Sequence, residues 1–316
     1  MDRYIGRYAP TPSGRMHLGN LSTLLLAWLD ARSGGGRFLL RIEDLDRARC
    51  KPAYTDQLLR DLDIFGFDYD GTPVRQSERD ICYIETLEKL KKAAWLYECF
   101  CTRAELHSDR RNPVDADANA PQLGAEAPVY SGKCRNLSDA DRQVLRLTRN
   151  PSLRIEVPDC DISFRDLKFG DFTENLARNC GDFVLRRSDG GWAYQLAVVA
   201  DDAAQGITTV VRGRDLLSST PRQIWLFSLL GKQPPSYLHV PLLMAPDGRR
   251  LSKRERDKEL GAMLEHLSPG EIIGRLAFLL GIAPDPSPRM PGDLLPCYRR
   301  ERIPTDDIVV PADFLD

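Results

Sequence analysis

The sequence predicts an α/β fold organised around a parallel sheet, and three consecutive segments near its start carry this prediction. An apolar strand start precedes a turn rich in Pro and Gly, and residues 20–31 then have the composition of a buried helix. That helix is expected to stop before the glycines at 34–36. Residues 38–42 form a nearly continuous apolar run, typical of a parallel strand covered on both faces. Strand, helix and strand in this order predict a right-handed crossover unit.

Beyond this unit, an insertion is expected to divide the sheet. Residues 107–128 are rich in Ala, Asp, Asn and Pro without periodicity, which predicts an exposed loop or a partly disordered insert. Between residues 143 and 175, short strand-like segments alternate with turns. We therefore expect a small mixed subdomain inserted into the main sheet.

The other segments return to the α/β pattern and then become helical. Strands are expected at residues 152–157, 161–164, 183–185, 207–212 and 237–244, and helices at 52–65, at 78–97 (ending in Trp95 and Tyr97), at 194–199, from Pro221, and at 271–280 before a Pro-rich tail. The predicted domains are residues 1–98 and 176–255 as two halves of the main domain, 99–175 as the inserted subdomain, and 256–316 as a helical C-terminal segment.

The composition is that of a globular protein without a dominant charge. The chain has 316 residues, of which 42% are hydrophobic and 28% charged, and its net charge is −2. No apolar stretch approaches the roughly 20 residues that a membrane span requires, and the charged start lacks a signal-peptide core. A cytoplasmic protein without a membrane anchor is expected. Its eight cysteines are then thiols or metal ligands rather than a disulfide framework.

The stretch Arg7-Tyr-Ala-Pro-Thr-Pro-Ser-Gly-Arg-Met-His17-Leu-Gly-Asn20 has the features of a loop that delivers a phosphate-bearing ligand to a helix N-terminus. The first backbone N–H groups of a helix lack partners there, and the helix dipole favours negative charge. His17 is placed to donate to a phosphate oxygen as charge develops in a transition state. Taken alone, the stretch fits equally well a proline-stiffened loop before a capped helix.

A second phosphate-binding candidate is Asp247-Gly-Arg-Arg-Leu-Ser-Lys253-Arg254, which follows a predicted strand. Its glycine and cations suit a loop that closes over a triphosphate, with Lys253 as a compact charge. On its own, a solvated basic turn is the more frequent explanation of such a stretch. Together with His17-Leu-Gly-Asn20, it resembles the two signature motifs of class I aminoacyl-tRNA synthetases.

Further motifs narrow the resemblance to the glutamyl branch of that class. They are Arg7-Tyr-Ala-Pro-Thr-Pro-Ser-Gly, Arg41-Ile-Glu-Asp44, Arg75-Gln-Ser-Glu-Arg79 and Val211-Arg-Gly-Arg-Asp215. The resemblance implies a class I synthetase fold with a Rossmann-type parallel sheet. Two departures occur, because Asn20 stands where the class usually has His and Arg250 replaces the first Lys of the basic motif. Both keep a hydrogen-bond donor or a cation.

The resemblance also implies roles for individual residues. An α-amino dicarboxylic acid needs cations for its carboxylates and an anion for its ammonium group, which Arg7, Arg212 and Glu43 supply. The implied glutamate-binding residues are Arg7, Tyr8, Ala9, Pro10, Thr11, Ser13, Glu43, Tyr194 and Arg212; the catalytic ones are His17, Asn20 and Lys253; the ATP-binding ones are His17, Gly19, Asn20, Leu251, Ser252 and Lys253. Alternatively, Glu43 caps a helix or forms a surface ion pair, and Arg212 bridges Asp215.

The cysteines at Cys99-x-Cys101 and Tyr130-x3-Cys134 form a third motif. Three thiolates and a phenol suffice for a tetrahedral zinc site, although tyrosine is an unusual ligand because its pKa of about 10 must fall first. Buried free thiols are the alternative. This spacing is similar to the zinc site of glutamyl-queuosine tRNA(Asp) synthetases, short paralogues of glutamyl-tRNA synthetase, and so implies one structural Zn²⁺.

The length of the chain agrees with that resemblance. A glutamyl-tRNA synthetase continues into a helical domain that reads the anticodon, whereas about sixty residues follow Lys253 here, so no such domain is expected. The resemblance implies a monomer that uses L-glutamate and ATP with Mg²⁺, binds the anticodon arm of tRNA(Asp), and glutamylates queuosine at the wobble position. Two alternatives remain open: a truncated glutamyl-tRNA synthetase that charges a tRNA 3′ end, and a non-catalytic paralogue that senses adenylate or binds RNA.

Overall fold

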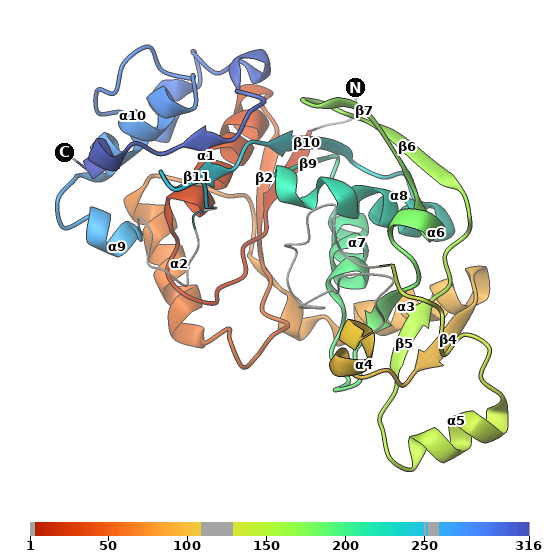
Figure 1. The fold of residues 1–316 in the computed structure, drawn as a ribbon. Coiled ribbons are helices and arrows are strands. Elements are labelled where there is room, and N and C mark those ends of the chain that lie inside the picture. Colours follow the sequence, from red (N-terminus) through yellow and green to blue (C-terminus); the bar gives the residue numbers. More distant parts are fainter. Residues whose placement is uncertain (1–3, 109–128, 250, 252–258, 316) are drawn as a thin grey trace.

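Parallel strands form the centre of the molecule (Figure 1). The computed structural model describes residues 4–108, 129–249, 251 and 259–315. Strands β1 (Ile5–Tyr8), β2 (Arg37–Ile42) and β3 (Val74–Arg75) pair in parallel, as do β9 (Thr209–Gly213) and β10 (Ser236–Val240). The amide of Thr208 donates to the carbonyl of Ile5 at 2.9 Å, which brings β9 beside β1. The predicted α/β fold and its first crossover unit are confirmed.

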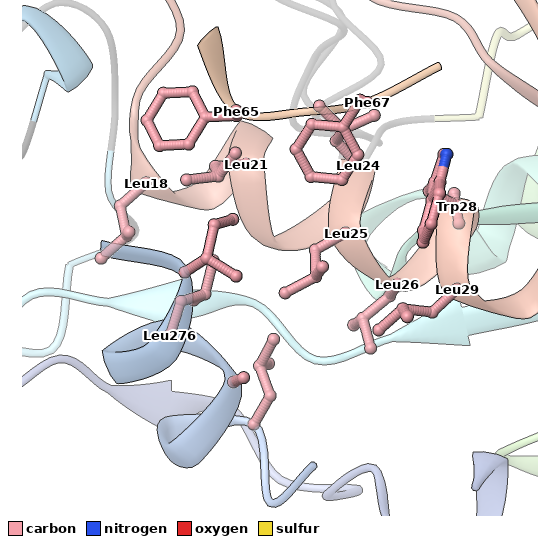
Figure 2. Close-up of a cluster of buried hydrophobic side chains, with 14 of the residues drawn as sticks. Leu18, Leu21, Leu24, Leu25, Leu26, Trp28, Leu29, Phe65, Phe67 and Leu276 are labelled. Atoms are coloured by element: carbon pink, nitrogen blue, oxygen red, sulfur yellow. The ribbon is translucent and has the colours of Figure 1, made fainter. Parts of the chain in front are cut away.

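Helix α1 (Leu18–Ser33) is the centre of the largest core. Its leucines are buried on nearly every side, and in Figure 2 they lie near Phe65 and Phe67, which follow α2, and near Leu276 from a later helix. Each fully buried leucine stabilises the fold by about 1.5–3 kcal/mol relative to exposure. The helix therefore has a rigid position, and its N-terminus is a fixed point for the site described below.

Four further helices accompany the parallel strands. They are α2 (Pro52–Ile64), α3 (Asp80–Ala93), α7 (Tyr194–Gln205) and α8 (Thr220–Leu229), joined by the 3-10 turns η1 (Gln76–Glu78) and η2 (Arg214–Ser219). The helices predicted at residues 52–65, at 194–199 and from Pro221 are thus confirmed. In the described part of the chain, no helix is long and apolar enough to cross a membrane.

The middle of the chain forms two antiparallel sheets. Strands β4 (Leu96–Cys99), β5 (Ser152–Ile155) and β8 (Phe183–Arg186) make one, and the hairpin of β6 (Asp161–Asp166) and β7 (Gly170–Asn175) makes the other. The short helices in this region are α4 (Arg103–Ser108), α5 (Asp139–Arg146) and α6 (Leu176–Asn179). Helix α5 has no buried residue and stands away from the rest of the ribbon (Figure 1).

Two strand assignments differ from expectation. The helix predicted at residues 78–97 ends at Ala93, and Trp95 and Tyr97 lie at strand β4 instead. Pairing of β4 with β5 explains this, together with a 2.5 Å hydrogen bond from the Tyr97 hydroxyl to Asp182. Residues 183–185, expected to resume the parallel pattern, pair antiparallel with β5. An apolar run indicates a buried strand but not the direction of its partner.

The C-terminal segment is less helical than predicted. It contains α9 (Leu260–Met263) and α10 (Pro269–Leu279), then the 3-10 turns η4 (Pro291–Leu294), η5 (Arg300–Arg302) and η6 (Ala312–Leu315). Strand β12 (Ile308–Val309) pairs with β11 (Leu243–Met244), so the strand predicted at 237–244 is split into β10 and β11. The buried carboxylate of Asp30 in α1 accepts from Tyr298 at 3.0 Å and from Arg300 at 2.5 Å, which ties this segment to α1.

Candidate functional site

His17 caps the N-terminus of α1. Its Nδ1 accepts the Gly19 amide at 3.0 Å, and its own amide donates to Oδ1 of Asn20 at 3.2 Å. Because Nδ1 uses its lone pair on the helix, the neutral ring carries its hydrogen on Nε2. The side-chain oxygen of Asn20 is used by the His17 amide, so its NH₂ group is the part that can donate to a ligand. Two side-chain donors thus stand at the positive end of the α1 dipole, an arrangement that suits an anionic ligand.

Gly19 makes room for the His17 ring. A Cβ atom at residue 19 would lie 2.9 Å from Cε1 and 3.0 Å from Nδ1 of His17. We expect Gly19→Ala to displace the ring and to lower kcat for glutamate-dependent pyrophosphate exchange by at least about tenfold, equivalent to about 1.4 kcal/mol. Thermal unfolding should change little, since alanine favours helices. Unchanged kcat in a folded variant would contradict the role given to His17.

The segment that follows the predicted basic loop is anchored beside His17, and the loop itself is tied to β11 at Leu251. Within the loop, the Leu251 amide donates to the carbonyl of Leu243 at 3.1 Å, and after the loop the Leu260 amide donates to the carbonyl of Met16 at 3.0 Å. His17 and Glu259 also form an isolated antiparallel bridge. Leu251 itself is buried. Ser252 and Lys253 lie outside the described residues, so their contacts with ATP stay predictions.

Four of the predicted glutamate-binding residues come together from separate elements. They are Arg7 in β1, Glu43 after β2, Tyr194 at the start of α7 and Arg212 in β9. The Glu43 amide donates to the carbonyl of Pro10 at 3.0 Å, which holds Glu43 against the loop after β1. Burial raises the pKa of Glu43, and the charges of Arg41 and Arg7 oppose that rise. Burial also raises the pKa of Tyr194, opposed by Arg212.

The two arginines differ in what surrounds them. Arg7 donates to Asp202 and to the carbonyl of Val211, both at 3.4 Å. Arg212 is 4% exposed, and it donates only to neutral groups: His239 at 3.1 Å, Gln223 at 2.8 Å, Thr220 at 2.7 Å and the Leu216 carbonyl at 3.2 Å. The charge of Arg212 contributes to lowering the pKa of the buried Asp202, but the hydrogen bonds of the guanidinium go to neutral groups, so this environment suits a bound carboxylate. The four hydrogen bonds thus account for Arg212 without the bridge to Asp215 that was the alternative from the sequence.

The other predicted contacts lie along the loop after β1. The Tyr8 hydroxyl donates to Sδ of Met16 at 3.4 Å and therefore supports the loop from inside. Ala9, Pro10 and Ser13 are partly buried and Thr11 is exposed. The Ser13 amide donates to the Thr11 carbonyl at 2.9 Å, which makes a tight turn. This loop is the one that Glu43 contacts through the Pro10 carbonyl.

The predicted metal ligands also converge. The sulfurs of Cys99, Cys101 and Cys134 lie within 4.8 Å of one another, and those of Cys101 and Cys134 are 3.5 Å apart. The Tyr130 oxygen lies 3.3 Å from the Cys99 sulfur and 3.6 Å from that of Cys101. With zinc bonds of about 2.3 Å to sulfur and 2.0 Å to oxygen, a tetrahedron has S–S edges of about 3.8 Å and S–O edges of about 3.5 Å. The four side chains therefore fit one tetrahedral zinc ion.

Comparison with known proteins agrees with this geometry. Residues 5–284 match the family model of the catalytic domain of class I tRNA synthetases (E and Q). The chain is 45% identical to the glutamyl-Q tRNA(Asp) synthetase of Symbiobacterium thermophilum, over 98% of this chain and 96% of that one. The chain belongs to the glutamyl-Q tRNA(Asp) synthetase family. The member from Nitratidesulfovibrio vulgaris is 44% identical, over 98% of this chain and 97% of that one.

Solved structures of glutamyl-tRNA synthetases share the fold of this glutamyl-Q tRNA(Asp) synthetase family member. The enzyme from Elizabethkingia anophelis superimposes with a TM-score of 0.83 at 26% identity, covering 99% of this chain and 69% of that one. A glutamate tRNA ligase from Elizabethkingia meningosepticum, solved with its amino acid, gives 0.82 at 26% identity, covering 99% and 68%. The resemblance inferred from the motifs is confirmed, and so is the class I catalytic domain.

Sequence motifs alone gave no role to the acidic pair that joins the site in this family member. Asp202 in α7 accepts from Arg41 at 2.6 Å, and Arg41 is fully buried. Its neighbour Asp201 accepts from Gln76 at 2.8 Å, Arg79 at 2.5 Å and Tyr83 at 2.9 Å. The Arg41-Ile-Glu-Asp44 and Arg75-Gln-Ser-Glu-Arg79 motifs are thus held together by α7. The sequence feature that could have indicated this role is the pair of adjacent aspartates among the alanines and valines of α7.

A second buried carboxylate supports the cysteine cluster. Asp182 accepts from Tyr97 at 2.5 Å and from Nε of Arg135 at 3.0 Å, and so fixes the residues beside Cys99 and Cys134. Arg154 lies with its guanidinium carbon 3.9 Å from the centre of the Tyr130 ring. Hydrogen bonds within the cluster lower the pKa of Cys99 and raise that of Cys101, and burial raises the pKa of Tyr130, so without a metal the cluster holds its negative charge on Cys99. A thiolate is the form that binds zinc.

Proposed function

We propose that this protein activates L-glutamate with ATP and transfers it to queuosine at the wobble position of tRNA(Asp). It is a ligase of the aminoacyl-tRNA synthetase type, as its family membership indicates. The observation that carries the amino-acid assignment is the buried Arg212, whose hydrogen bonds go to neutral groups and whose charge acts on Tyr194 together with those of Arg7 and Glu43. Two cations and one anion match the charges of glutamate.

In the first step, the glutamate α-carboxylate attacks the α-phosphorus of ATP and pyrophosphate leaves. Arg7 and Arg212 bind the carboxylates, Glu43 binds the ammonium group, and Tyr194 adds a hydroxyl. His17 donates from Nε2 and Asn20 from its amide at the α1 N-terminus, where negative charge develops on the phosphate. Lys253 supplies a further cation. Mg²⁺ bound with ATP adds charge neutralisation to the phosphates.

In the second step, a hydroxyl of the queuosine cyclopentenediol attacks the mixed anhydride and AMP leaves. The site holds the activated carbonyl next to the incoming hydroxyl, so proximity and orientation lower the barrier and no covalent enzyme intermediate is required. The anticodon arm of tRNA(Asp) is the substrate that presents this hydroxyl. The protein acts as a monomer in the cytoplasm, where tRNA is available.

We also assign one structural zinc ion to Cys99, Cys101, Tyr130 and Cys134. The fit of the four ligand atoms to a tetrahedron supports this assignment. Bound zinc would supply a crosslink between β4 and the segment around Cys134. Because the cluster is formed by elements other than β1, β9 and α1, it stabilises the inserted subdomain rather than taking part in adenylation.

The nearest alternative is charging of a tRNA 3′ end, because the similar solved structures are glutamate tRNA ligases. A direct test incubates the protein with ATP, labelled glutamate and tRNA(Asp) that either contains or lacks queuosine. We expect label on the queuosine-containing tRNA only. A third arm contains queuosine-free tRNA(Glu), and labelling of that tRNA would select the alternative and overturn the proposal.

A further inference from the structure

The hairpin of β6 and β7 reaches strand β10 directly behind Arg212. Asp166, the last residue of β6, is 1% exposed, and His239 in β10 is fully buried. Oδ2 of Asp166 lies 2.6 Å from Nδ1 of His239 and accepts the His239 amide at 3.1 Å. Its Oδ1 accepts the amides of Lys168 and Phe169, both at 2.9 Å. The carboxylate therefore has partners on both oxygens, and these hold its pKa below the usual value despite burial.

These contacts decide which nitrogen of His239 carries the hydrogen. The Nε of Arg212 is always a donor, and it lies 3.1 Å from Nε2 of His239, so Nε2 must accept. The ring hydrogen is then on Nδ1 and is donated to Asp166. Burial lowers the pKa of His239 to about 4, and the charge of Arg212 acts in the same direction. The ring is consequently neutral near pH 7.

The rest of the environment leaves the guanidinium little freedom. Tyr237 lies under it, with the guanidinium carbon 5.1 Å from the ring centre, and Tyr237 is stacked on His239 at 6.1 Å and 12°. Gln223 and Thr220 hold its two terminal nitrogens. Among the described residues His239 is the partner of Nε, and its acceptor completes the set of contacts that fixes the plane of the guanidinium.

We propose that Asp166 and His239 are positioning residues of the amino-acid site, which orient Arg212 toward the substrate carboxylate through one tautomer of His239. This inference rests on the proposed function, in which Arg212 binds glutamate. It makes the tip of the inserted hairpin a part of the glutamate site. Neither residue touches the substrate, so both act through Arg212 alone.

Two substitutions of His239 separate positioning from simple packing. In His239→Gln the terminal oxygen takes the place of Nε2 and still accepts from Arg212, while the bond to Asp166 is lost. In His239→Asn the amide takes the place of Nδ1 and still donates to Asp166, while Arg212 loses its acceptor. We expect His239→Asn to raise KM for glutamate on the order of 10- to 100-fold, and His239→Gln by less than about threefold. KM for ATP should change by less than about twofold in both variants.

The opposite order would overturn the inference. If His239 only anchors the hairpin, His239→Asn is the milder variant, and thermal stability and both KM values change together in His239→Gln. Pyrophosphate exchange by the unchanged protein provides the reference: if it shows no glutamate dependence, the proposed function fails as well. If exchange by the unchanged protein depends on glutamate but the two variants have equal KM for glutamate, the positioning role is refuted and the proposed function stands.

A measurement on the unchanged protein gives an independent test. The ¹⁵N shifts of the two ring nitrogens of His239 report its tautomer. Because the sequence contains four histidines, the His239 signals are assigned as those that disappear in His239→Gln. We expect the hydrogen on Nδ1 at pH 7 and a move to Nε2 in Asp166→Asn, together with a raised glutamate KM. A hydrogen on Nε2 in the unchanged protein would contradict the inference.

Discussion

Replacement of Arg212 by glutamine is expected to lower kcat/KM for glutamate in pyrophosphate exchange by roughly 10³-fold, equivalent to about 4 kcal/mol. The guanidinium is buried and its present partners are neutral, so a substrate carboxylate would be its counterion. Four of the five guanidinium N–H groups are already bonded to protein, so one hydrogen bond between charged groups, worth about 1.5–3 kcal/mol, is lost in this variant together with the attraction of the positive charge. The effect should fall on glutamate, with KM for ATP nearly unchanged.

Two variants control for charge and geometry. Arg178→Gln removes an arginine whose side chain is 74% exposed and pairs with Asp159 at the surface, and we expect exchange within about twofold of the unchanged protein. Arg212→Lys keeps the charge but loses the planar fork, so an intermediate loss is expected. A folded Arg212→Gln protein with normal glutamate KM would remove Arg212 from the site.

Replacement of Cys99 by serine is expected to remove the zinc. Metal analysis should give about one zinc per chain in the unchanged protein and less than about 0.1 in the variant, because a serine hydroxyl does not replace a thiolate. Structural zinc contributes about 10–16 kcal/mol to folding of small zinc modules, so the inserted subdomain should unfold at a lower temperature. This destabilisation is expected to precede any loss of adenylate formation.

Cys160→Ser is the matched control, since Cys160 lies in the inserted region and is not one of the clustered cysteines. It should retain zinc and thermal stability. Tyr130→Phe tests the fourth ligand separately: it keeps three sulfurs and the ring over which Arg154 lies, and it should bind zinc more weakly. A metal-free unchanged protein of equal stability would show that the cluster is only a group of buried thiols.

The helices and strands with a strong apolar pattern of their own could be predicted from the sequence. The apolar run of α1, the glycines that follow it and the apolar strand β2 each predict their structure without reference to distant residues. The motifs predicted that Arg7, Glu43 and Arg212 lie near one another, because strand ends of a parallel sheet meet at one edge, and the resemblance added Tyr194. The cysteine spacing likewise foretold a cluster that the structure brings together.

Contacts between distant segments could not be predicted in this way. Asp166 and His239 are 73 residues apart, and neither stands in a recognisable motif. Asp202 and Arg41 are separated by 161 residues, although both are buried in one ion pair. Strand β4 was mistaken for the end of a helix because its partner β5 lies more than fifty residues later. In each case the deciding partner is remote in sequence.

Transfer of glutamate to queuosine is tested most directly by tRNA(Asp) from which the 3′-terminal adenosine has been removed. Such a tRNA has no 3′ acceptor diol, and its queuosine is intact. With ATP and labelled glutamate, we predict that the queuosine-containing trimmed tRNA is labelled as well as the full-length one, and that the queuosine-free form is not labelled. Loss of labelling on trimming, with queuosine present, would contradict the account.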